Sequence, residues 1–192
     1  RPSWGLNIPV NFSYSKNTDI PKYYPGSDVL LDKSDDAAVD TIRSRTINKS
    51  YDINISRQER SENPIMKYTV DGLSGNYSYN TSDISNQNSV FDQTQTRTAG
   101  LHYSISLPEQ TDLSLFGWAK NIPILKKLSD TKMRYIPGSI NLDIDGTRTQ
   151  RSSLTRSNSY SASNNFNITR KINTNWRLFN PMTLTFSRTH VS

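Results

Sequence analysis

Residues 4–14, WGLNIPVNFSY, alternate without exception between apolar side chains and small or polar ones. A β-strand places successive side chains on opposite faces, so this stretch predicts a strand with one wholly apolar face. A tilted strand of about 9–11 residues also crosses the hydrocarbon core of a bilayer. The apolar row begins with Trp4 and ends with Tyr14, residue types that favour the two membrane–water interfaces. The same stretch would suit a soluble β-sandwich, so the rest of the chain must decide.

Composition narrows the fold class. The 192 residues are enough for one domain, but only 33% are hydrophobic and the mean hydropathy is -0.71. Disordered chains have this composition, and so do membrane barrels whose strands keep one face in a water-filled lumen. Aromatic residues make up 10% of the chain, and the apolar residues fall in period-two rows, which favours the barrel. No run of about 20 apolar residues exists, so a transmembrane helix is not expected.

Charge and cysteine content exclude other classes. The chain has no cysteine, which rules out a disulfide framework and a thiolate metal site. The net charge is +6, but Arg and Lys are scattered, mostly singly, rather than clustered, so we expect a solvated or lumenal face and no nucleic-acid partner. The chain begins with RPSW, close to a strand, and ends at residues 189–192 without a visible stop, so we expect it to be part of a longer protein.

Alternating rows along the chain predict seven or eight strands. The acidic residues after Ser34 predict a short helix near residues 35–44. Two long connectors, over 16–50 and 108–133, are expected to be structured; the second would hold a short helix starting near Pro123, either interfacial or packed by its own side chains. The remaining expectations are a short strand at 51–55, one long bulged strand over roughly 64–81, a turn at 82–91, a strand or a loop at 147–155, and a polar turn at Arg170 and Lys171.

In a membrane barrel the apolar rows would face lipid and the rows of Asn, Ser, Thr and Arg would face the lumen. In a soluble sandwich the same apolar rows would face a shared core. Tyr23, Tyr24 and Trp118 are candidate contacts to connectors or partners. The predicted lipid-facing residues are Trp4, Leu6, Ile8, Val10, Phe12, Tyr14, Leu101, Tyr103, Ile105, Leu107, Ile140, Leu142, Ile144, Met182, Leu184 and Phe186.

Residues suited to catalysis are few. His102 is predicted on the polar face of a strand, and His190 is the only other histidine. No Gly-x-Ser-x-Gly elbow supports a hydrolase. Asp143 and Asp145 form a spaced pair, but the third acidic ligand and closing Glu of a calcium loop are missing. We therefore expect no enzyme and no catalytic, metal-binding or cofactor-binding residues.

Five segments, in order along nearly the whole chain, carry a resemblance to a known family. They are IPVNFSYSKNTDIPKYYPGSDVLL, KYTVDGLSGNYSYN, FGWAKNIPILKKL, IPGSINLDIDGTRTQRSS and FNITRKINTNWRLFNPMTLTFSR. The chain resembles the SprA family, the large outer-membrane translocons of gliding motility and type IX secretion in Bacteroidetes. No single segment is as specific as a metal-ligand motif, and the resemblance rests on their succession.

The resemblance implies an all-β fold, namely an antiparallel transmembrane β-barrel segment that forms one arc of a very large barrel with short helical connectors. Residues 1–192 would then belong to one barrel domain in the bacterial outer membrane. The family exports folded proteins through its lumen, so the implied partners are outer-membrane lipid, secreted protein substrates and plug or capping proteins. Two other interpretations remain open: another outer-membrane channel or transporter, and a secreted soluble β-sandwich adhesin.

Overall fold

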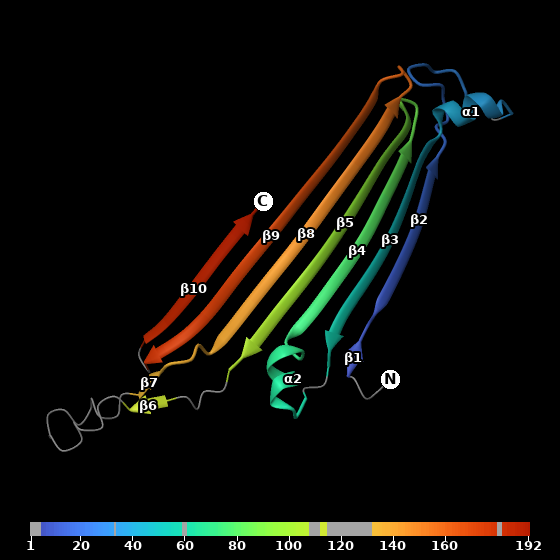
Figure 1. The fold of residues 1–192 in the computed structure, drawn as a ribbon. Coiled ribbons are helices and arrows are strands. Elements are labelled where there is room, and N and C mark those ends of the chain that lie inside the picture. Colours follow the sequence, from blue (N-terminus) through green and yellow to red (C-terminus); the bar gives the residue numbers. More distant parts are fainter. Residues whose placement is uncertain (1–4, 33, 59–60, 108–111, 115–131, 180–181) are drawn as a thin grey trace.

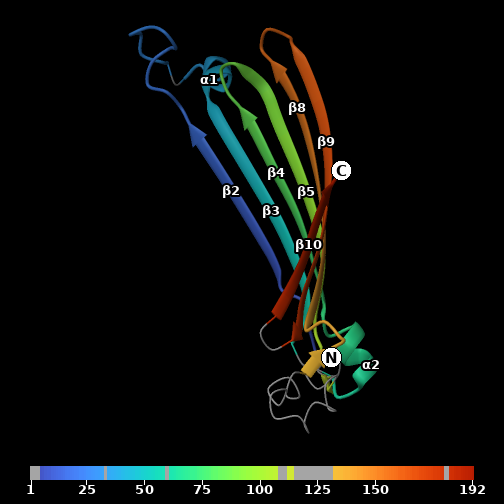
Figure 2. The same ribbon diagram turned by 90° about the vertical axis from the view of Figure 1, so that its left-hand side faces the viewer.

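The computed structural model describes residues 5–32, 34–58, 61–107, 112–114, 132–179 and 182–192. Strands hold 69% of the residues and helices 8%, which confirms the all-β class. Eight strands form one antiparallel sheet in the order β2–β3–β4–β5–β8–β9–β10, and the short β1 also pairs with β3 (Figure 1). The sheet is open, with β2 and β10 at its edges, and it twists strongly when seen from the side (Figure 2).

The strands of the main sheet are long, and most neighbours pair over ten or more residues. The strands are β1 (Leu6–Asn7), β2 (Val10–Asp19), β3 (Ser44–Arg57), β4 (Leu73–Ser85), β5 (Ser89–Ser106), β8 (Ser139–Thr155), β9 (Tyr160–Phe179) and β10 (Met182–Val191).

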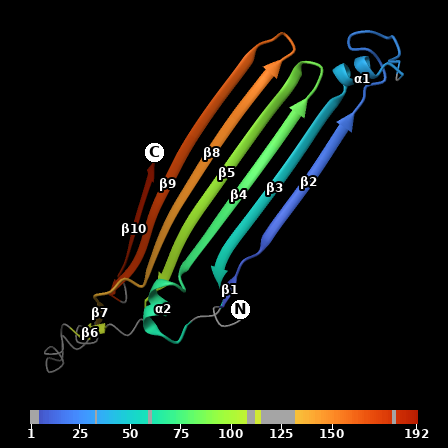
Figure 3. The same ribbon diagram turned by 45° about the vertical axis from the view of Figure 1, so that its right-hand side comes forward.

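A short helix, α1 (Asp36–Ile42), lies in the connection from β2 to β3 at one end of the sheet (Figure 3). The side chain of Asp35 caps it by accepting a hydrogen bond from the Ala38 N–H at 3.1 Å. Just before it, hydrogen bonds from Ser34 hold the pKa of the Asp32 carboxyl below its usual value. The helix expected near residues 35–44 is therefore confirmed.

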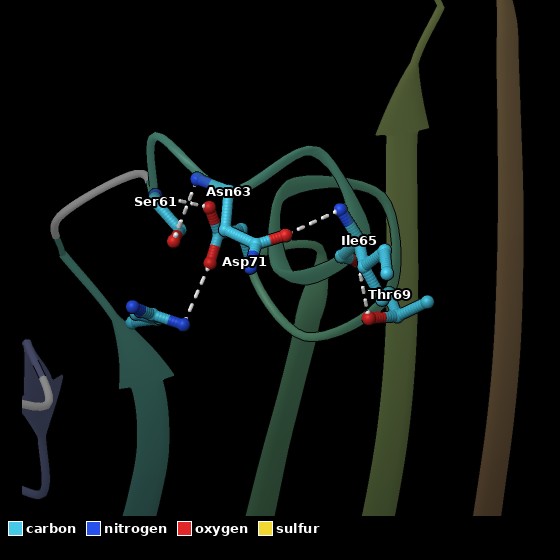
Figure 4. Close-up of polar contacts among 6 residues, drawn as sticks. Ser61, Asn63, Ile65, Thr69 and Asp71 are labelled. Atoms are coloured by element: carbon cyan, nitrogen blue, oxygen red, sulfur yellow. Dashed lines mark hydrogen bonds and ion pairs between the residues drawn. The ribbon is translucent and has the colours of Figure 1, made fainter.

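A second helix, α2 (Pro64–Thr69), lies at the opposite end of the sheet, between β3 and β4. The prediction of one long strand over 64–81 is therefore wrong in its first part. The Asn63 side chain accepts a hydrogen bond from the Ile65 N–H at 3.0 Å, and Pro64 occupies the first turn, where its missing N–H is no loss (Figure 4). The apparent alternation of residues 66–70 spans too few residues to distinguish a strand from one helical turn.

Turns at the α1 end of the sheet are shorter than predicted. β4 and β5 are joined by residues 86–88 alone, so the predicted turn over 82–91 is wrong at both ends. The Asn86 side chain accepts hydrogen bonds from the Asn88 and Ser89 N–H groups, both at 2.9 Å, and so closes the chain reversal locally. In the next hairpin Asn158 adopts φ 65°, a left-handed conformation that asparagine tolerates.

Sheet pairing continues two further strands through polar sequence, which contradicts one prediction and decides between the alternatives of another. Arg170 and Lys171 lie inside β9, not in a turn, and residues 147–155 belong to β8. The predicted short strand at 51–55 is the last part of β3. The interstrand ladder satisfies the backbone of these polar segments as it does that of apolar ones.

The predicted connectors are also revised. Residues 16–19 belong to β2 and 44–50 to β3, so the first connector is shorter than 16–50. Of the second, the structure describes β6 (Asp112–Ser114) and β7 (Lys132–Arg134), which pair with each other. The helix expected near Pro123 lies outside the described residues.

The sheet has almost no hydrophobic core. Among the described residues, Leu31 and Ile105 are the only hydrophobic side chains that are buried, and thirty large hydrophobic side chains are exposed. A single sheet with no covering layer leaves both faces open. Both faces of the sheet are therefore left uncovered by the described residues.

Candidate functional surface: an apolar belt opposite a polar face

The strand registers divide the side chains of the sheet into two faces of opposite character. Residues directly opposite each other in an antiparallel pair point to the same side, so the registers can be followed from β2 to β10. The apolar residues fall on one side. We call the following set the apolar belt: Leu6, Val10, Phe12, Tyr14, Tyr51, Ile53, Ile55, Leu73, Tyr77, Tyr79, Leu101, Tyr103, Ile105, Ile140, Leu142, Ile144, Ile172, Trp176, Leu184 and Phe186.

Most of the apolar belt is open to its surroundings. Val10 is 64% exposed, Phe12 59% and Phe186 57%. Ile105 lies on the same face but is only 8% exposed, because α2 lies against this end of β5. The Tyr103 hydroxyl donates a hydrogen bond to the Tyr68 carbonyl of α2 at 2.5 Å. An exposed apolar surface of this extent marks an interaction surface rather than the outside of a soluble monomer.

The apolar belt crosses the sheet obliquely. Val10 is the midpoint of the apolar run over 6–14, and across β3, β4, β5 and β8 it lies in register with Ile168 of β9. Leu184 is the midpoint of the run on β10, and it pairs with Trp176, eight residues further along β9 (168 to 176). With a rise of about 3.4 Å per residue and a strand spacing of about 4.8 Å, this drift over six strand steps corresponds to about 45°.

Aromatic side chains line both margins of the apolar belt. Toward the α1 end, Phe12 and Tyr51 have ring centroids 4.8 Å apart, and Tyr51 and Tyr79 follow at 6.2 Å. Toward the α2 end, the Trp176 indole N–H donates a hydrogen bond to the Arg134 carbonyl at 2.8 Å. Transmembrane β-barrels also carry aromatic residues at both margins of their apolar band.

The opposite side of the sheet, which we call the polar face, carries Asn, Ser, Thr, Gly and charged residues. Where the registers are regular, Ile84 and Val191 are its only apolar side chains in the seven long strands among the described residues; Val90 and Phe179 lie at register shifts. The Arg151 guanidinium forms two hydrogen bonds to the Asp92 carboxylate, at 2.6 and 3.0 Å. β9 contributes Ser161, Ser163, Asn165, Asn167, Thr169, Lys171, Asn173 and Asn175 in succession.

The one dense polar cluster on this face surrounds His102. Its Nδ1 lies 3.0 Å from an Asp143 carboxylate oxygen, and its Nε2 lies 3.0 Å from the Asn76 amide oxygen. A β-carbon on Gly100 would collide with Asn76, Asp145 and His102, so the glycine makes room for the cluster. The predicted placement of His102 on the polar face is confirmed. Among the described residues, no three His, Cys, Asp or Glu side chains are placed to hold a metal ion.

The structure brings most of the predicted lipid-facing residues onto the apolar belt. Leu107 follows β5, where its N–H donates to the Gly138 carbonyl at 2.9 Å, and Met182 precedes a register shift in β10. Ile8 lies between β1 and β2 and is 51% exposed. Trp4 lies outside the described residues. Whether the shared face contacts lipid stays a prediction.

Of the three candidate partner contacts, the structure describes Tyr23 and Tyr24. Tyr23 forms a bridge with Leu30, and the Lys22 ammonium lies 5.4 Å from its ring centroid. The Tyr24 N–H donates to the Val29 carbonyl at 2.9 Å, so both tyrosines belong to a closed loop before α1. Trp118 lies outside the described residues.

Two features of the belt side were missed by sequence reasoning. One is α2, which closes the end of the sheet near Ile105. The other is the direct pairing of Arg97 with Arg148 at the margin of the apolar belt. Alternation assigns each arginine to the apolar row of its own strand, but only the register of β5 against β8 brings them together.

No family model matches this chain, and no curated protein is similar enough to count as a relative. Within the described residues, no helix has both the length and the apolar character needed to cross a bilayer. The expectations that the chain is not an enzyme, and that it belongs to one barrel domain, stay predictions. The sheet is a single layer whose apolar belt suits contact with an apolar environment and whose polar face suits contact with water.

Proposed function

We propose that this chain is a wall segment of an outer-membrane β-barrel, with the apolar belt toward lipid and the polar face toward a water-filled lumen. The observation that carries the proposal is the oblique path of the exposed apolar belt across the registers. Strands of transmembrane barrels tilt by about 35–45° from the membrane normal, close to the slope of the belt. A band parallel to the membrane must cross the registers of such strands obliquely.

A soluble β-sandwich accounts less well for the same surface. Its sheets pack with strands nearly aligned and bury the inner face under a second layer. The belt here is wide, exposed and edged with aromatic rings. A sandwich would leave the aromatic margins and the overall drift of about 45° without a reason.

Membrane insertion explains a further property of the segment. In hydrocarbon, backbone N–H and C=O groups at a sheet edge must be paired, so β2 and β10 require neighbouring strands. Both edges are free of proline over their full length, which allows continuous pairing. In the proposed barrel, further strands would continue the sheet at both edges.

The finer proposal is that the barrel is the protein-conducting channel of type IX secretion and gliding motility. It rests on the resemblance to the SprA family carried by the five segments above. In that role the Asn, Ser and Thr of the polar face would give a hydrated surface over which folded proteins slide without tight binding. Secreted proteins and plug or capping proteins would be its partners, in the bacterial outer membrane.

Two measurements test the two levels separately. An antibody to this segment, used on fractionated cell envelopes, should detect an outer-membrane protein far larger than 21.9 kDa that requires detergent for extraction. A small protein released without detergent would contradict the barrel and favour the adhesin. Depletion of the protein should then block export of type IX substrates. Continued export from depleted cells would leave the barrel intact but make it another channel or transporter.

A further inference from the structure

Two arginines face each other at the margin of the apolar belt that lies toward α1. Arg97 of β5 and Arg148 of β8 are direct register partners, so their side chains leave the same face side by side. Like charges placed directly opposite each other destabilise a sheet unless an anion lies between them. Both side chains are exposed, and neither pairs with a carboxylate among the residues that the structure describes.

Each arginine is oriented by a neighbour that leaves most of its donors available. The Arg97 guanidinium lies over the Tyr79 ring, 5.4 Å from the centroid. The Arg148 Nε–H donates to the Asn164 amide oxygen at 3.0 Å, which leaves its terminal nitrogens unused. Guanidinium groups bind phosphate oxygens through paired N–H donors, so two of them held together form a phosphate cradle.

Directly beside the arginine pair the apolar belt is hollowed. The hollow measures about 480 Å³, and it is lined by the two arginines together with mostly apolar side chains. Its floor is formed by two small residues, Ala99 and Gly146, which are register partners. Its walls are Tyr77, Leu101, Ile144 and Phe166.

The charges of the two faces favour an anion on the belt side. Beyond the pair, Arg170 and Arg188 continue as exposed cations on the belt side of β9 and β10. The strand carboxylates of Asp52, Asp92 and Asp143 lie on the polar face, while Asp83 is on the belt side nearer α1.

We propose that Arg97, Arg148 and the hollow beside them form a binding site for an anionic phospholipid, whose headgroup phosphate carries an unbalanced negative charge. The two guanidinium groups hold the phosphate, and one acyl chain lies over Ala99 and Gly146. The inference rests on the proposed membrane insertion, since only then does the belt meet lipid. The proposed site would give the apolar belt a preference for one kind of lipid, which the rest of the belt lacks.

The test uses the intact protein reconstituted in phosphatidylcholine vesicles. Electron paramagnetic resonance measures how strongly spin-labelled phosphatidylglycerol associates with the protein relative to spin-labelled phosphatidylcholine. The double variant Arg97→Gln, Arg148→Gln should lower this preference by about 25-fold, since each arginine near a membrane surface contributes roughly fivefold. The variant Arg97→Lys, Arg148→Lys should keep most of it.

Two variants separate a site from diffuse charge attraction. Gly146→Leu places a side chain in the hollow, where a β-carbon has no neighbour closer than 3.9 Å, and should lower the preference several-fold with every charge intact. The matched control Arg151→Gln, Lys171→Gln removes two cations from the polar face and should change nothing.

The proposal is overturned if the Arg97→Gln, Arg148→Gln variant keeps the preference of the unmodified protein. It is also overturned if Gly146→Leu has no effect, because the attraction would then be diffuse. If no motionally restricted lipid of either kind appears around the unmodified protein, membrane insertion itself fails, and the proposed function falls with it.

Discussion

Gly72 stands where the chain leaves α2 and approaches β5 most closely. Its carbonyl accepts a hydrogen bond from the Ser104 N–H at 2.8 Å. A β-carbon added to Gly72 would collide with the Ser104 carbonyl oxygen, a backbone atom that cannot move without displacing the strand. Gly75, three residues later, has its nearest such contact at 3.5 Å, which is ordinary packing.

We therefore predict that Gly72→Ala lowers the free energy of unfolding by about 1–3 kcal/mol, through backbone displacement. Gly75→Ala is the matched control and should be neutral or slightly stabilising, because glycine is unfavourable inside a strand. The urea midpoint of the reconstituted protein measures both. Equal midpoints for the two variants would show that β4 and β5 are not in this close contact.

The effect of an introduced charge on stability depends on whether the residue lies on the apolar belt or on the polar face. Leu142 lies at the middle of the apolar run on β8, and Thr147 lies on the polar face of the same strand. An arginine near the bilayer midplane of a barrel costs about 2–4 kcal/mol, whereas lumenal positions accept charge. We expect Leu142→Arg to lower the free energy of unfolding in vesicles by that amount and Thr147→Arg to leave it nearly unchanged. The reverse order would place the lipid on the other face.

At the scale of elements, α2 is fixed to the sheet by a nearly buried ion pair. Asp71 is 5% exposed in its side chain, and its carboxylate lies 2.8 Å from the Arg57 guanidinium at the end of β3 (Figure 4). Its other oxygen accepts a hydrogen bond from the Ser61 N–H at 2.5 Å. The pair is close but not aligned as a hydrogen bond, so Coulomb attraction rather than directional bonding holds it.

Asp71→Ala should lower the free energy of unfolding by about 3 kcal/mol, because it leaves the Arg57 charge in a largely buried position without a partner. Arg57→Leu combined with Asp71→Ala should cost clearly less than the sum of the single variants. Denaturant unfolding of the four proteins measures the coupling. Strict additivity would mean that the two side chains do not interact.

The strands and helices also show which elements could be predicted from the sequence. The alternating runs at 101–105, 140–144 and 182–186 predicted strands correctly, because alternation is strict and continuous there. The run over 6–14 was predicted as one strand, but it is divided into β1 and β2 at Ile8 and Pro9. Alternation failed for Met66, Tyr68 and Val70, since one helical turn is too short to reveal its period. The Asn63–Pro64 sequence was the available signal for the start of that helix. Arg170 and Lys171 were assigned to a turn because local polarity carries no information about pairing with β8.

At the scale of the whole molecule, sequence predicted a one-sided apolar surface but not its geometry. Each strand reveals its own apolar row, whereas the offset between rows depends on registers set by loops and helices. The drift of the belt across β9, and the pairing of Arg97 with Arg148, follow only from those registers. The candidate surface was therefore predictable residue by residue, whereas its oblique path and the proposed lipid site were not.

The most direct test uses single-cysteine variants of this segment, which has no cysteine of its own, after any cysteine elsewhere in the intact protein has been replaced by serine. Nitroxide labels would be placed in the intact, reconstituted protein at each residue of 140–147 in β8 and 49–56 in β3. Accessibility to oxygen reports lipid, and accessibility to a water-soluble nickel chelate reports the lumen. The account predicts strict alternation, with oxygen access at even positions of β8 and odd positions of β3. The oxygen maximum should fall at Leu142 and Ile53, although the register partner of Ile53 on β8 is Gly146. Nickel access at both faces, or oxygen maxima at Ile53 and Gly146 together, would contradict a tilted membrane wall.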